Sequence, residues 1–465
     1  MLMKLLTIER TLQRMARLTL WRIWYVRWYR VGLALVKLGL LVGGFVGAYL
    51  AASYLFSPDI QYKDFRQEYT MARAILAGVD PYQPTYILTE KFAGFGADQP
   101  VRAPAYHPPT DGFVFLPFGA LDYFTAARVW FCLECAIFLP TIVLLLRVAG
   151  VKRGGWSLAG ISIMALAWGP FYTELALGQV MLPVLLLLLL SRFALKDGHQ
   201  WRAGFYLGAS LLIKPLLWPV VFLFVVQRRW RAAATSSAVV AAGYAVATVV
   251  LGPVRVLSYF TEIGPTGPRL YGDWSTNFSA WTIGWRVFHG TGLETPSSGI
   301  RAAPLLASPA AAGLVSAALP AILLVLCLWG VRGSRDLDRS LAVVVCVSLL
   351  ISPFAWVFDL VVVSFAVAVA VGWLRENRFP PAITVATAIV AAALLPSFTI
   401  WEGALLPLLV HPVPADPKAV LPFIAVLPAF IPTLAVALLV LTIWFMRTEK
   451  SSASNAPPAT GGAAQ

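Results

Sequence analysis

Long apolar stretches separated by short polar connections are the main pattern along this chain. A membrane-spanning helix needs roughly 20 apolar residues, and the sequence contains eleven candidates for such helices. They cover residues 31–56, 122–147, 156–172, 178–195, 203–226, 231–252, 310–331, 339–352, 354–373, 380–399 and 420–446. The pattern therefore predicts an all-α, polytopic integral membrane protein.

The segment 203–226 is predicted to be two half-helices rather than one span. It is flanked on both sides by basic residues, namely Arg192, Lys196, Arg202, Arg228, Arg229 and Arg231. Basic flanks face the cytoplasm, and Lys214-Pro215 at the centre of the segment interrupts the helix. A broken backbone is tolerated at membrane depth where it lines a polar cavity. Counting this hairpin twice gives about 12 membrane passes, short hairpins included, with both termini in the cytoplasm.

This topology divides the chain into three regions. Residues 1–30 are rich in Lys, Arg, Trp and Tyr, which predicts a cytoplasmic interfacial anchor that is retained with the first span. Residues 31–446 form the predicted transmembrane domain, with large outer loops at 57–111 and 253–309. Residues 447–465 are rich in Ser, Ala, Pro and Gly, a composition typical of a disordered cytoplasmic tail.

Composition agrees with a membrane protein and gives no reason to expect a nucleic-acid partner. The chain is 59% hydrophobic and only 12% charged, with a mean hydropathy of +0.76, whereas soluble proteins have roughly 25% charged residues. The formal net charge is +14. Basic cytoplasmic connections account for most of this charge.

The first polar stretch after the first apolar segment predicts a short amphipathic helix on the outer face. Phe65, Tyr69 and Ala72 recur at helical spacing, and Gly78 supplies a stop. Such a helix would lie on the membrane surface. Asp64 stands at its N-terminal end and has two interpretations: an N-cap residue, or a catalytic carboxylate beside the exit of the first span.

Polar residues at the outer turns of three predicted hairpins form a second group of candidates. Ionisable residues at membrane depth are costly, so a functional site is the default hypothesis. The turns carry Glu174, Gln179, Lys214 and Asp359, and the outer loops add Glu68, His107, Asn277 and Arg286. Lys214 is compatible with a structural ion pair to Asp359 and with binding of an anionic ligand. Glu174 and Gln179 are equally compatible with turn and cap roles.

A set of short motifs, in a fixed order, links these residues to a known family. The motifs are Asp64-Phe65-x-x-x-Tyr69, Ala77-Gly78-x-x-Pro81-Tyr82, His107-Pro108-Pro109, Leu177-Gly178-Gln179, Gly208 with Lys214-Pro215, Asn277-x-Ser279, and Ser352-Pro353 ahead of Asp359-Leu360. Each is weak alone. Their shared order over roughly residues 30–375 resembles glycosyltransferase family 87. These integral-membrane GT-C enzymes are typified by polyprenol-phosphate-mannose-dependent alpha-(1-2)-mannosyltransferases.

The resemblance implies a GT-C-like catalytic domain that takes a sugar from a lipid-linked phosphate at the outer leaflet. Members of the family generally use an acidic residue just after the first span, which falls on Asp64 here. They often carry His after the Ser-Pro-x-x-Trp motif, whereas this chain has Val357, Phe358 and Asp359. The donor sugar and the acceptor therefore stay open.

Glycosyl transfer also fits the chemistry of these residues. A carboxylate can take the proton of an attacking hydroxyl, and positive charge with hydrogen-bond donors stabilises a departing phosphate. We predict Asp64 as the general base, Lys214, Arg286, Gln179 and Asn277 as donor-phosphate ligands, and Glu68, His107, Glu174 and Asp359 as further candidates. No cofactor and no metal are expected, because the sequence carries no convincing motif for either.

The sequence thus predicts a multi-pass hexosyltransferase of the plasma membrane whose active site faces the extracytoplasmic side. Its expected partners are a polyprenyl-phosphate-linked sugar, with mannose preferred, a lipid or glycan acceptor, and membrane lipids. Transfer of arabinofuranose or glucose is the alternative within the same fold. A lipid or sugar-phosphate transporter would also use broken helices and buried charges, but the polar motifs lie on one face and the two halves show no symmetry. A catalytically silent scaffold is the third alternative.

Overall fold

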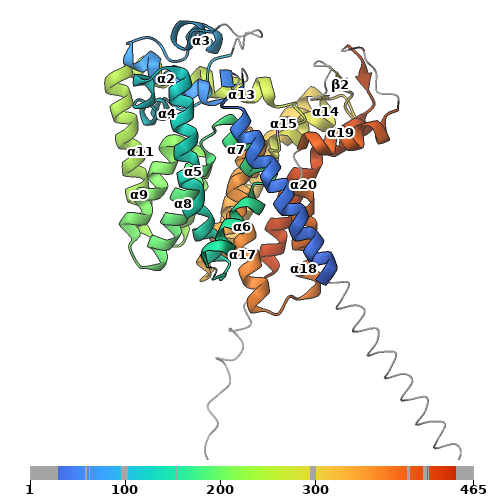
Figure 1. The fold of residues 1–465 in the computed structure, drawn as a ribbon. Helices are drawn as coiled ribbons and strands as arrows, with labels where there is room; N and C mark the ends of the chain where they lie inside the picture. The colour runs from blue at the N-terminus through green and yellow to red at the C-terminus, as the bar shows by residue number, and fades with distance from the viewer. Residues whose placement is uncertain are drawn as a thin grey trace, which may run out of the picture.

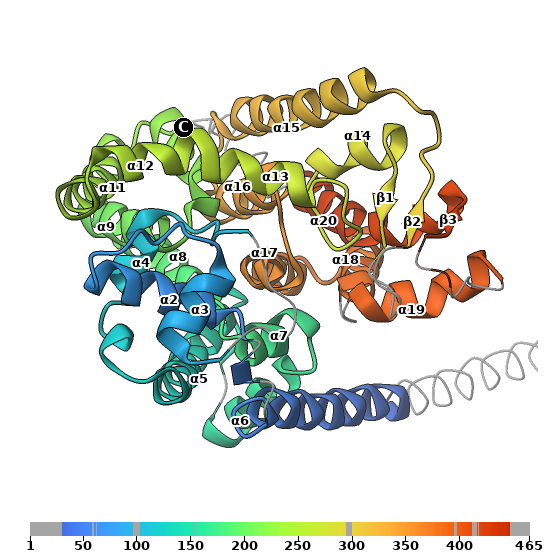
Figure 2. The ribbon, with the colours of Figure 1, turned by 90° about the horizontal axis from the view of Figure 1, so that it is seen from above.

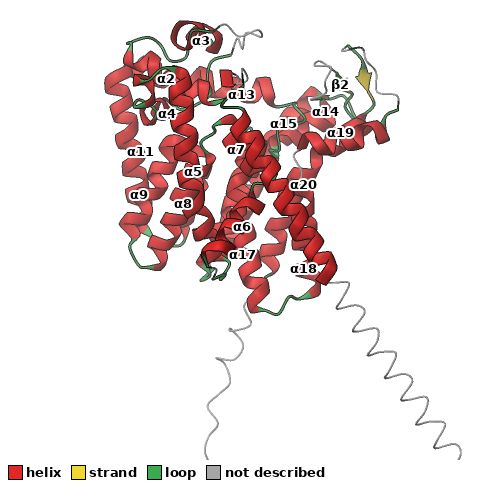
Figure 3. Cartoon of the chain, in the orientation of Figure 1, coloured by secondary structure: helices red, strands yellow, loops and turns green. Residues whose placement is uncertain are grey.

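Helices make up most of the chain in the computed structural model (Figures 1 and 3). It describes residues 30–57, 60–61, 63–95, 103–152, 154–293, 300–394, 398–411, 416 and 418–446. The predicted anchor, apart from residue 30, and the predicted tail lie outside the described residues. Three two-residue strands are a small departure from the all-α prediction. They are β1 (Thr291–Gly292), β2 (Arg301–Ala302) and β3 (Val420–Leu421), with β1 antiparallel and β3 parallel to β2.

Six helices in the described part are long and apolar enough to cross a membrane. They are Arg30–Ser53, α5 (Tyr123–Val148), α11 (Trp230–Leu251), α15 (Pro309–Val331), η5 with α17 (Val357–Val362 and Val363–Glu376), and η6 with α20 (Phe423–Val426 and Leu427–Phe445). The prediction of a helical membrane protein is confirmed in this coarse form. The count of twelve passes stays a prediction.

The expected span 156–172 is not one continuous helix. α6 (Gly155–Ala165) ends before α7 (Gly169–Leu177), and α7 meets α8 (Met181–Lys196) at a bend of 119°. Gly178 ends α7 with a left-handed backbone (φ 68°), a conformation that glycine adopts without strain. The bend sets the turn between α7 and α8 at the end of the molecule where the outer-loop helices lie.

The segment 203–226 is broken at Lys214, as the sequence predicted. α9 (Gln200–Ile213) ends there because a proline disfavours helical backbone in the residue before it, and Lys214 is extended (φ −144°, ψ 119°). The 3₁₀-helix η3 (Pro215–Leu217) and α10 (Pro219–Val226) follow.

Contacts at the two ends of this broken segment show that the chain folds back. Lys196, before α9, forms an ion pair with Asp338 at 2.5 Å. Gln227, after α10, donates a hydrogen bond to the carbonyl of Ser334 at 3.5 Å. Both ends therefore lie beside the single connection between α15 and α16, and Lys214 is at the turn of a hairpin.

One end of the molecule gathers short helices from the two predicted outer loops and from the residues just after the first of them (Figures 1 and 2). They are α2 (Phe65–Leu76), α3 (Thr85–Ala93), α4 (Pro109–Val114), η2 (Phe118–Ala120), α12 (Pro253–Ser258), the π-helix η4 (Tyr259–Ile263), α13 (Gly264–Tyr271) and α14 (Trp281–Phe288). The predicted amphipathic helix is α2. It buries Phe65, Tyr69 and Ala72, but also Glu68 and Thr70, because α3, α4 and η2 pack around it. Its position on a membrane surface stays a prediction.

The most deeply buried helix is α16 (Leu337–Ile351), in which every residue from Ser340 to Ile351 is buried. A helix that is apolar all round belongs in a core, and α16 packs against α10, α15, α17 and α20. Asp336 caps its first turn by accepting a hydrogen bond from the backbone N–H of Arg339. The helices α18 (Pro381–Leu394) and α19 (Phe398–Leu409) pack against α20. This core fixes the Ser352–Phe358 loop and Asp359 beyond the end of α16.

Candidate active site

A cavity of about 1170 Å³ lies among the outer loops and the hairpin turns. Its polar and charged lining includes Asp64, Gln67, His107, Thr173, Gln179, Lys214, Thr276 and Ser352. Aromatic rings form much of the remaining wall, among them Tyr106, Trp218, Tyr271, Trp274, Trp356 and Phe358. The turns of all three predicted hairpins and both large outer loops thus meet at one site, although they are far apart in sequence.

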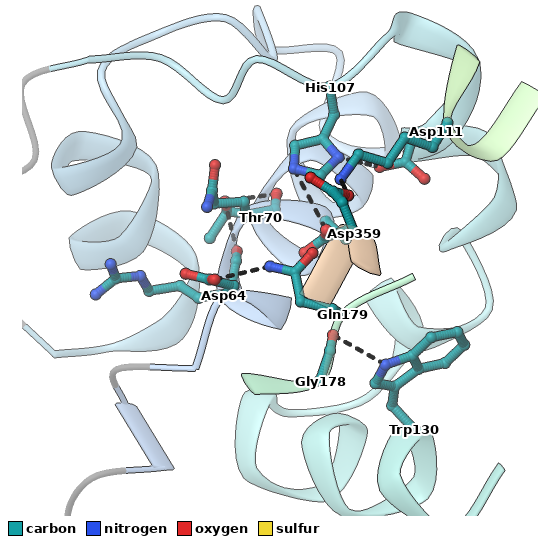
Figure 4. Close-up of polar contacts among 12 residues, drawn as sticks. Asp64, Thr70, His107, Asp111, Trp130, Gly178, Gln179 and Asp359 are labelled. Carbon is teal, nitrogen blue, oxygen red and sulfur yellow. Dashed lines mark hydrogen bonds and ion pairs between the residues drawn. The ribbon is translucent and has the colours of Figure 1, made fainter. Parts of the chain in front are cut away.

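Asp64 points its carboxylate toward the turn between α7 and α8. It occupies the N-cap position of α2, yet its side chain makes no capping hydrogen bond. Instead its Oδ2 accepts a hydrogen bond from Nε2 of Gln179 at 2.7 Å (Figure 4). Burial raises the pKa of Asp64 above its usual value, although the hydrogen bond from Gln179 and the charge of His107 act in the opposite direction. These features favour the catalytic interpretation of Asp64 over the capping one.

Gly178 is what lets Gln179 approach Asp64. A Cβ at Gly178 would lie 3.0 Å from the Cβ of Phe65, the first residue of α2. The Gly178 carbonyl also accepts a hydrogen bond from Nε1 of Trp130 at 3.1 Å (Figure 4). The Gly178-Gln179 pair of the sequence therefore has a physical reason: close approach of two backbones, followed by an amide aimed at a carboxylate.

Lys63 is a positioning residue that the sequence interpretation missed. Its buried Nζ donates hydrogen bonds to the carbonyls of Leu175 at 3.1 Å and Ala176 at 2.5 Å, near the C-terminal end of α7. Cations are favoured at that end of a helix. Burial lowers the pKa of Lys63 to about 8, against the raising effect of nearby carboxylates. The only sequence signal was a lysine next to Asp64.

Lys214 and Asp359 form an ion pair, so one of the two sequence interpretations of Lys214 has structural support. The Nζ of Lys214 lies 2.6 Å from Oδ1 of Asp359, and Oδ2 of Asp359 accepts a hydrogen bond from the backbone N–H of Trp356. The ammonium group also sits 5.0 Å from the ring centre of Phe358. Lys214 still lines the cavity, so ion pairing does not remove it from the reach of an anionic ligand.

His107 joins two acidic side chains behind the cavity wall. Its Nδ1 lies 3.0 Å from Oδ2 of Asp111, and its Nε2 lies 3.5 Å from Oε1 of Glu68. Burial raises the pKa of Glu68 and of Asp111. Burial would lower the pKa of His107, but the two carboxylates outweigh it and raise that pKa. Asp111 was not among the candidates selected from the sequence. The only signal for it was its position four residues after His107, a spacing that allows two side chains to meet.

Arg286 and Asn277 lie near the cavity but do not line it. Arg286 is fully buried, and its Nη atoms donate to the backbone carbonyls of Ala429, Ser275 and Asn277 at 2.6–2.9 Å. The Asn277 side chain accepts hydrogen bonds from the backbone N–H groups of Ser279 and Ala355. The geometry therefore gives both residues a role in joining the outer loops to each other, and gives no direct contact for a donor phosphate.

Glu174 also does not line the cavity. It is fully buried, and its Oε1 accepts a hydrogen bond from the backbone N–H of Leu182 at 2.6 Å. This contact holds the first turn of α8 against α7. The arrangement supports the turn and cap role that the sequence left open for Glu174.

The fold and the cavity define a helical membrane protein with a polar site among its outer loops. The family model of glycosyltransferase family 87 matches residues 106–353, more than half of the chain, and the chain belongs to this family. The predicted family is therefore confirmed. Asp64 and Glu68 precede the matched residues, so their roles rest on the geometry of this chain. No solved structure matches the chain.

Individual relatives align over only part of their length. An alpha-(1->3)-arabinofuranosyltransferase of Mycobacterium tuberculosis is 29% identical over 168 residues, which cover 34% of this chain and 37% of that protein. A polyprenol-phosphate-mannose-dependent alpha-(1-2)-phosphatidylinositol pentamannoside mannosyltransferase of Mycolicibacterium smegmatis is 26% identical over 273 residues, which cover 54% of this chain and 57% of that protein. An alpha-(1->3)-arabinofuranosyltransferase of Corynebacterium glutamicum is 25% identical over 173 residues, which cover 36% of this chain and 37% of that protein.

Proposed function

We propose that this protein transfers a glycosyl unit from a polyprenyl phosphate to an extracytoplasmic glycolipid or glycan, with Asp64 as the general base. The observation that carries the proposal is the carboxylate of Asp64, held by Gln179 at 2.7 Å in the same cavity as Lys214. Family membership supports the reaction class. The location in the plasma membrane, the twelve passes and the outward-facing site belong to the same proposal and rest on the basic flanks of the hairpins.

The reaction needs one proton transfer and one displacement. Asp64 takes the proton of the acceptor hydroxyl as the hydroxyl oxygen bonds to the anomeric carbon. The bond between that carbon and the phosphate oxygen breaks, and the polyprenyl phosphate leaves with the bonding electron pair. Lys214 supplies positive charge on the side where the negative charge grows. Attack from the face opposite the leaving group inverts the configuration, so a β-linked donor gives an α-linked product.

The walls of the cavity suit a donor with a charged head and an apolar chain. Aromatic residues from the turn after the first helix, the Lys214 hairpin and the π-helix η4 line it, including Tyr54, Trp218 and Phe260. Binding sites are typically apolar surfaces with a few placed polar groups. Here the placed polar groups include Asp64, Gln179, Lys214 and His107.

Mannose is the proposed sugar, and arabinofuranose is the second candidate. The alignment with the mannosyltransferase covers 54% of this chain, against 34% for an arabinofuranosyltransferase. Incubation of the purified protein with radiolabelled polyprenyl-phosphate mannose, arabinofuranose and glucose and a membrane lipid extract tests the choice. We expect label to move from the mannose donor to lipid or glycan. Transfer of label only from the arabinofuranose or glucose donor would contradict mannose as the donor sugar. Transfer from none of the three donors would contradict the proposal that the protein is an enzyme of this kind.

The pH dependence of turnover gives a separate test of the Asp64–Gln179 contact. Only the ionised carboxylate can accept a proton, so kcat/KM should rise with pH through the raised pKa of Asp64. The hydrogen bond from Gln179 stabilises the anion, so Gln179→Leu should move this acidic limb to still higher pH. His107, Arg66 and Lys214 act on the same carboxylate and remain unchanged in the variant. An unshifted limb in Gln179→Leu would mean that another group controls the profile.

A further inference from the structure

We propose that Glu68, His107 and Asp111 bind one divalent transition-metal cation behind the cavity wall, with Mn²⁺ or Zn²⁺ as the fitting ions. The sequence carries no recognisable motif for such a site, because the three residues come from α2, from the loop before α4 and from α4 itself. Only the tertiary fold brings them together.

The geometry of the three side chains suits a shared ion. Each offers one ligand atom, and these atoms all lie within 4.8 Å of one another. The imidazole of His107 contacts Asp111 (Figure 4) at 3.0 Å through Nδ1 and Glu68 at 3.5 Å through Nε2. A small cation among them would need only short side-chain movements to reach metal–ligand distances of roughly 2.0–2.2 Å.

Burial supplies an independent reason to expect an ion. The side chains of Glu68 and Asp111 are fully buried. In the part of the chain that the structure describes, the oxygens of Glu68 accept no hydrogen bond, and those of Asp111 have only the contact with His107. Buried charges are normally paired, hydrogen-bonded or bound to metals. Apart from the 3.5 Å ion pair with His107, the two buried oxygens of Glu68 have no hydrogen-bond donor among the described residues, and a metal ion would supply the missing ligand contact.

The local charge balance points in the same direction. With both carboxylates ionised beside an imidazolium, the buried cluster carries one net negative charge, and burial disfavours this charge by raising the pKa of Glu68 and Asp111. The nearby cation, Lys214, is already held by Asp359 at 2.6 Å. A divalent cation bound by two carboxylates and a neutral imidazole makes the cluster electrically neutral, which removes the cost of a buried net charge.

The ligand set selects the kind of ion. Carboxylate oxygens suit Mg²⁺, Ca²⁺ and Mn²⁺, whereas imidazole suits Zn²⁺ and other transition metals. A site with carboxylate and imidazole ligands favours a cation that binds both types, so Mn²⁺ and Zn²⁺ fit better than Mg²⁺. The ion would join α2 to α4 and hold His107 at the cavity rim. Glu68 and Asp111 do not line the cavity, so the ion has a positioning role and takes no part in the transfer step.

Metal uptake by the full-length purified protein tests the proposal without an activity assay. The protein is stripped with a chelator, incubated with Mn²⁺ or Zn²⁺, freed of excess ion by gel filtration and analysed by mass spectrometry. We expect a single equivalent of Mn²⁺ or Zn²⁺ to remain bound and to raise the thermal unfolding temperature. Mg²⁺ at the same concentration should do neither.

Paired variants assign the uptake to this cluster. In the double variant Glu68→Gln with Asp111→Asn, the bound equivalent and the thermal shift should both disappear. Glu90→Gln, at an exposed carboxylate on the neighbouring α3, should keep both. If the wild-type protein retains no ion, or if the double variant retains as much as Glu90→Gln, the cluster is a metal-free ion triad and the proposal is overturned. The double variant neutralises the unsatisfied carboxylates, and its circular dichroism spectrum verifies folding.

Discussion

Asp64→Asn is expected to lower turnover by about 10²- to 10⁴-fold, the usual loss when a general base is removed. Asparagine has nearly the same size, and its carbonyl oxygen can still accept the hydrogen bond that Gln179 donates to Asp64. It cannot accept the proton of an acceptor hydroxyl. Donor binding and folding should therefore remain close to those of the wild-type protein while kcat falls. Steady-state kinetics together with a donor-binding assay separates these quantities.

The same variant also tests the capping interpretation. Asp64 makes no side-chain capping hydrogen bond in the structure, and Asn caps a helix about as well as Asp. Stability should therefore change little, and Glu90→Gln serves as the matched control for loss of a carboxylate elsewhere. Near-normal turnover by Asp64→Asn would contradict the assignment. The search for a base would then move to Asp359, Glu68 and Glu174, with Asp359 first because it contacts a residue of the cavity.

Lys214→Met is expected to lower both stability and donor affinity. Methionine keeps much of the apolar stem but leaves the carboxylate of Asp359, which is 1% exposed, without its cation. Breaking a buried ion pair in this way costs about 3–5 kcal/mol. Loss of the charge should also weaken binding of the donor phosphate. Thermal unfolding and titration with polyprenyl-phosphate sugar measure the two effects separately.

The double variant Lys214→Met with Asp359→Asn separates the contribution of Lys214 to stability from its contribution to donor binding. It removes both charges, so much of the lost stability should return, because no unpaired carboxylate remains. Asn can still accept the hydrogen bond from the backbone N–H of Trp356, which Asp359 accepts now. Donor affinity should stay low in both variants. Recovery of donor affinity with stability would leave Lys214 a purely structural role.

The sequence determined the features that depend on local chemistry. Apolar length predicted a helical membrane protein because each span must be apolar and long enough on its own. Proline after Lys214 predicted the break in 203–226 because it restricts the residue before it. Helical spacing after Asp64 predicted α2 within one residue of its start. The ordered motifs predicted the family, which the match over residues 106–353 confirms.

Features that depend on which neighbour a side chain contacts in the fold were left open, or predicted wrongly, from the sequence. The sequence predicted Arg286, in an outer loop, as a phosphate ligand, but in the described structure folding brings backbone carbonyls to its hydrogen-bonding Nη atoms. The sequence predicted one helix over 156–172, because the apolar composition of this segment does not reveal the break between α6, which ends at Ala165, and α7, which begins at Gly169.

Only the tertiary structure brought distant polar residues into single clusters. Asp64 and Gln179 are 115 residues apart in the chain, and Lys214 and Asp359 are 145 apart, so no local pattern relates them. The partners of His107 depend in the same way on how α2 packs against α4. Local sequence set where each helix begins and breaks, whereas the packing of those helices decided which polar groups share a cavity and which ones serve the fold.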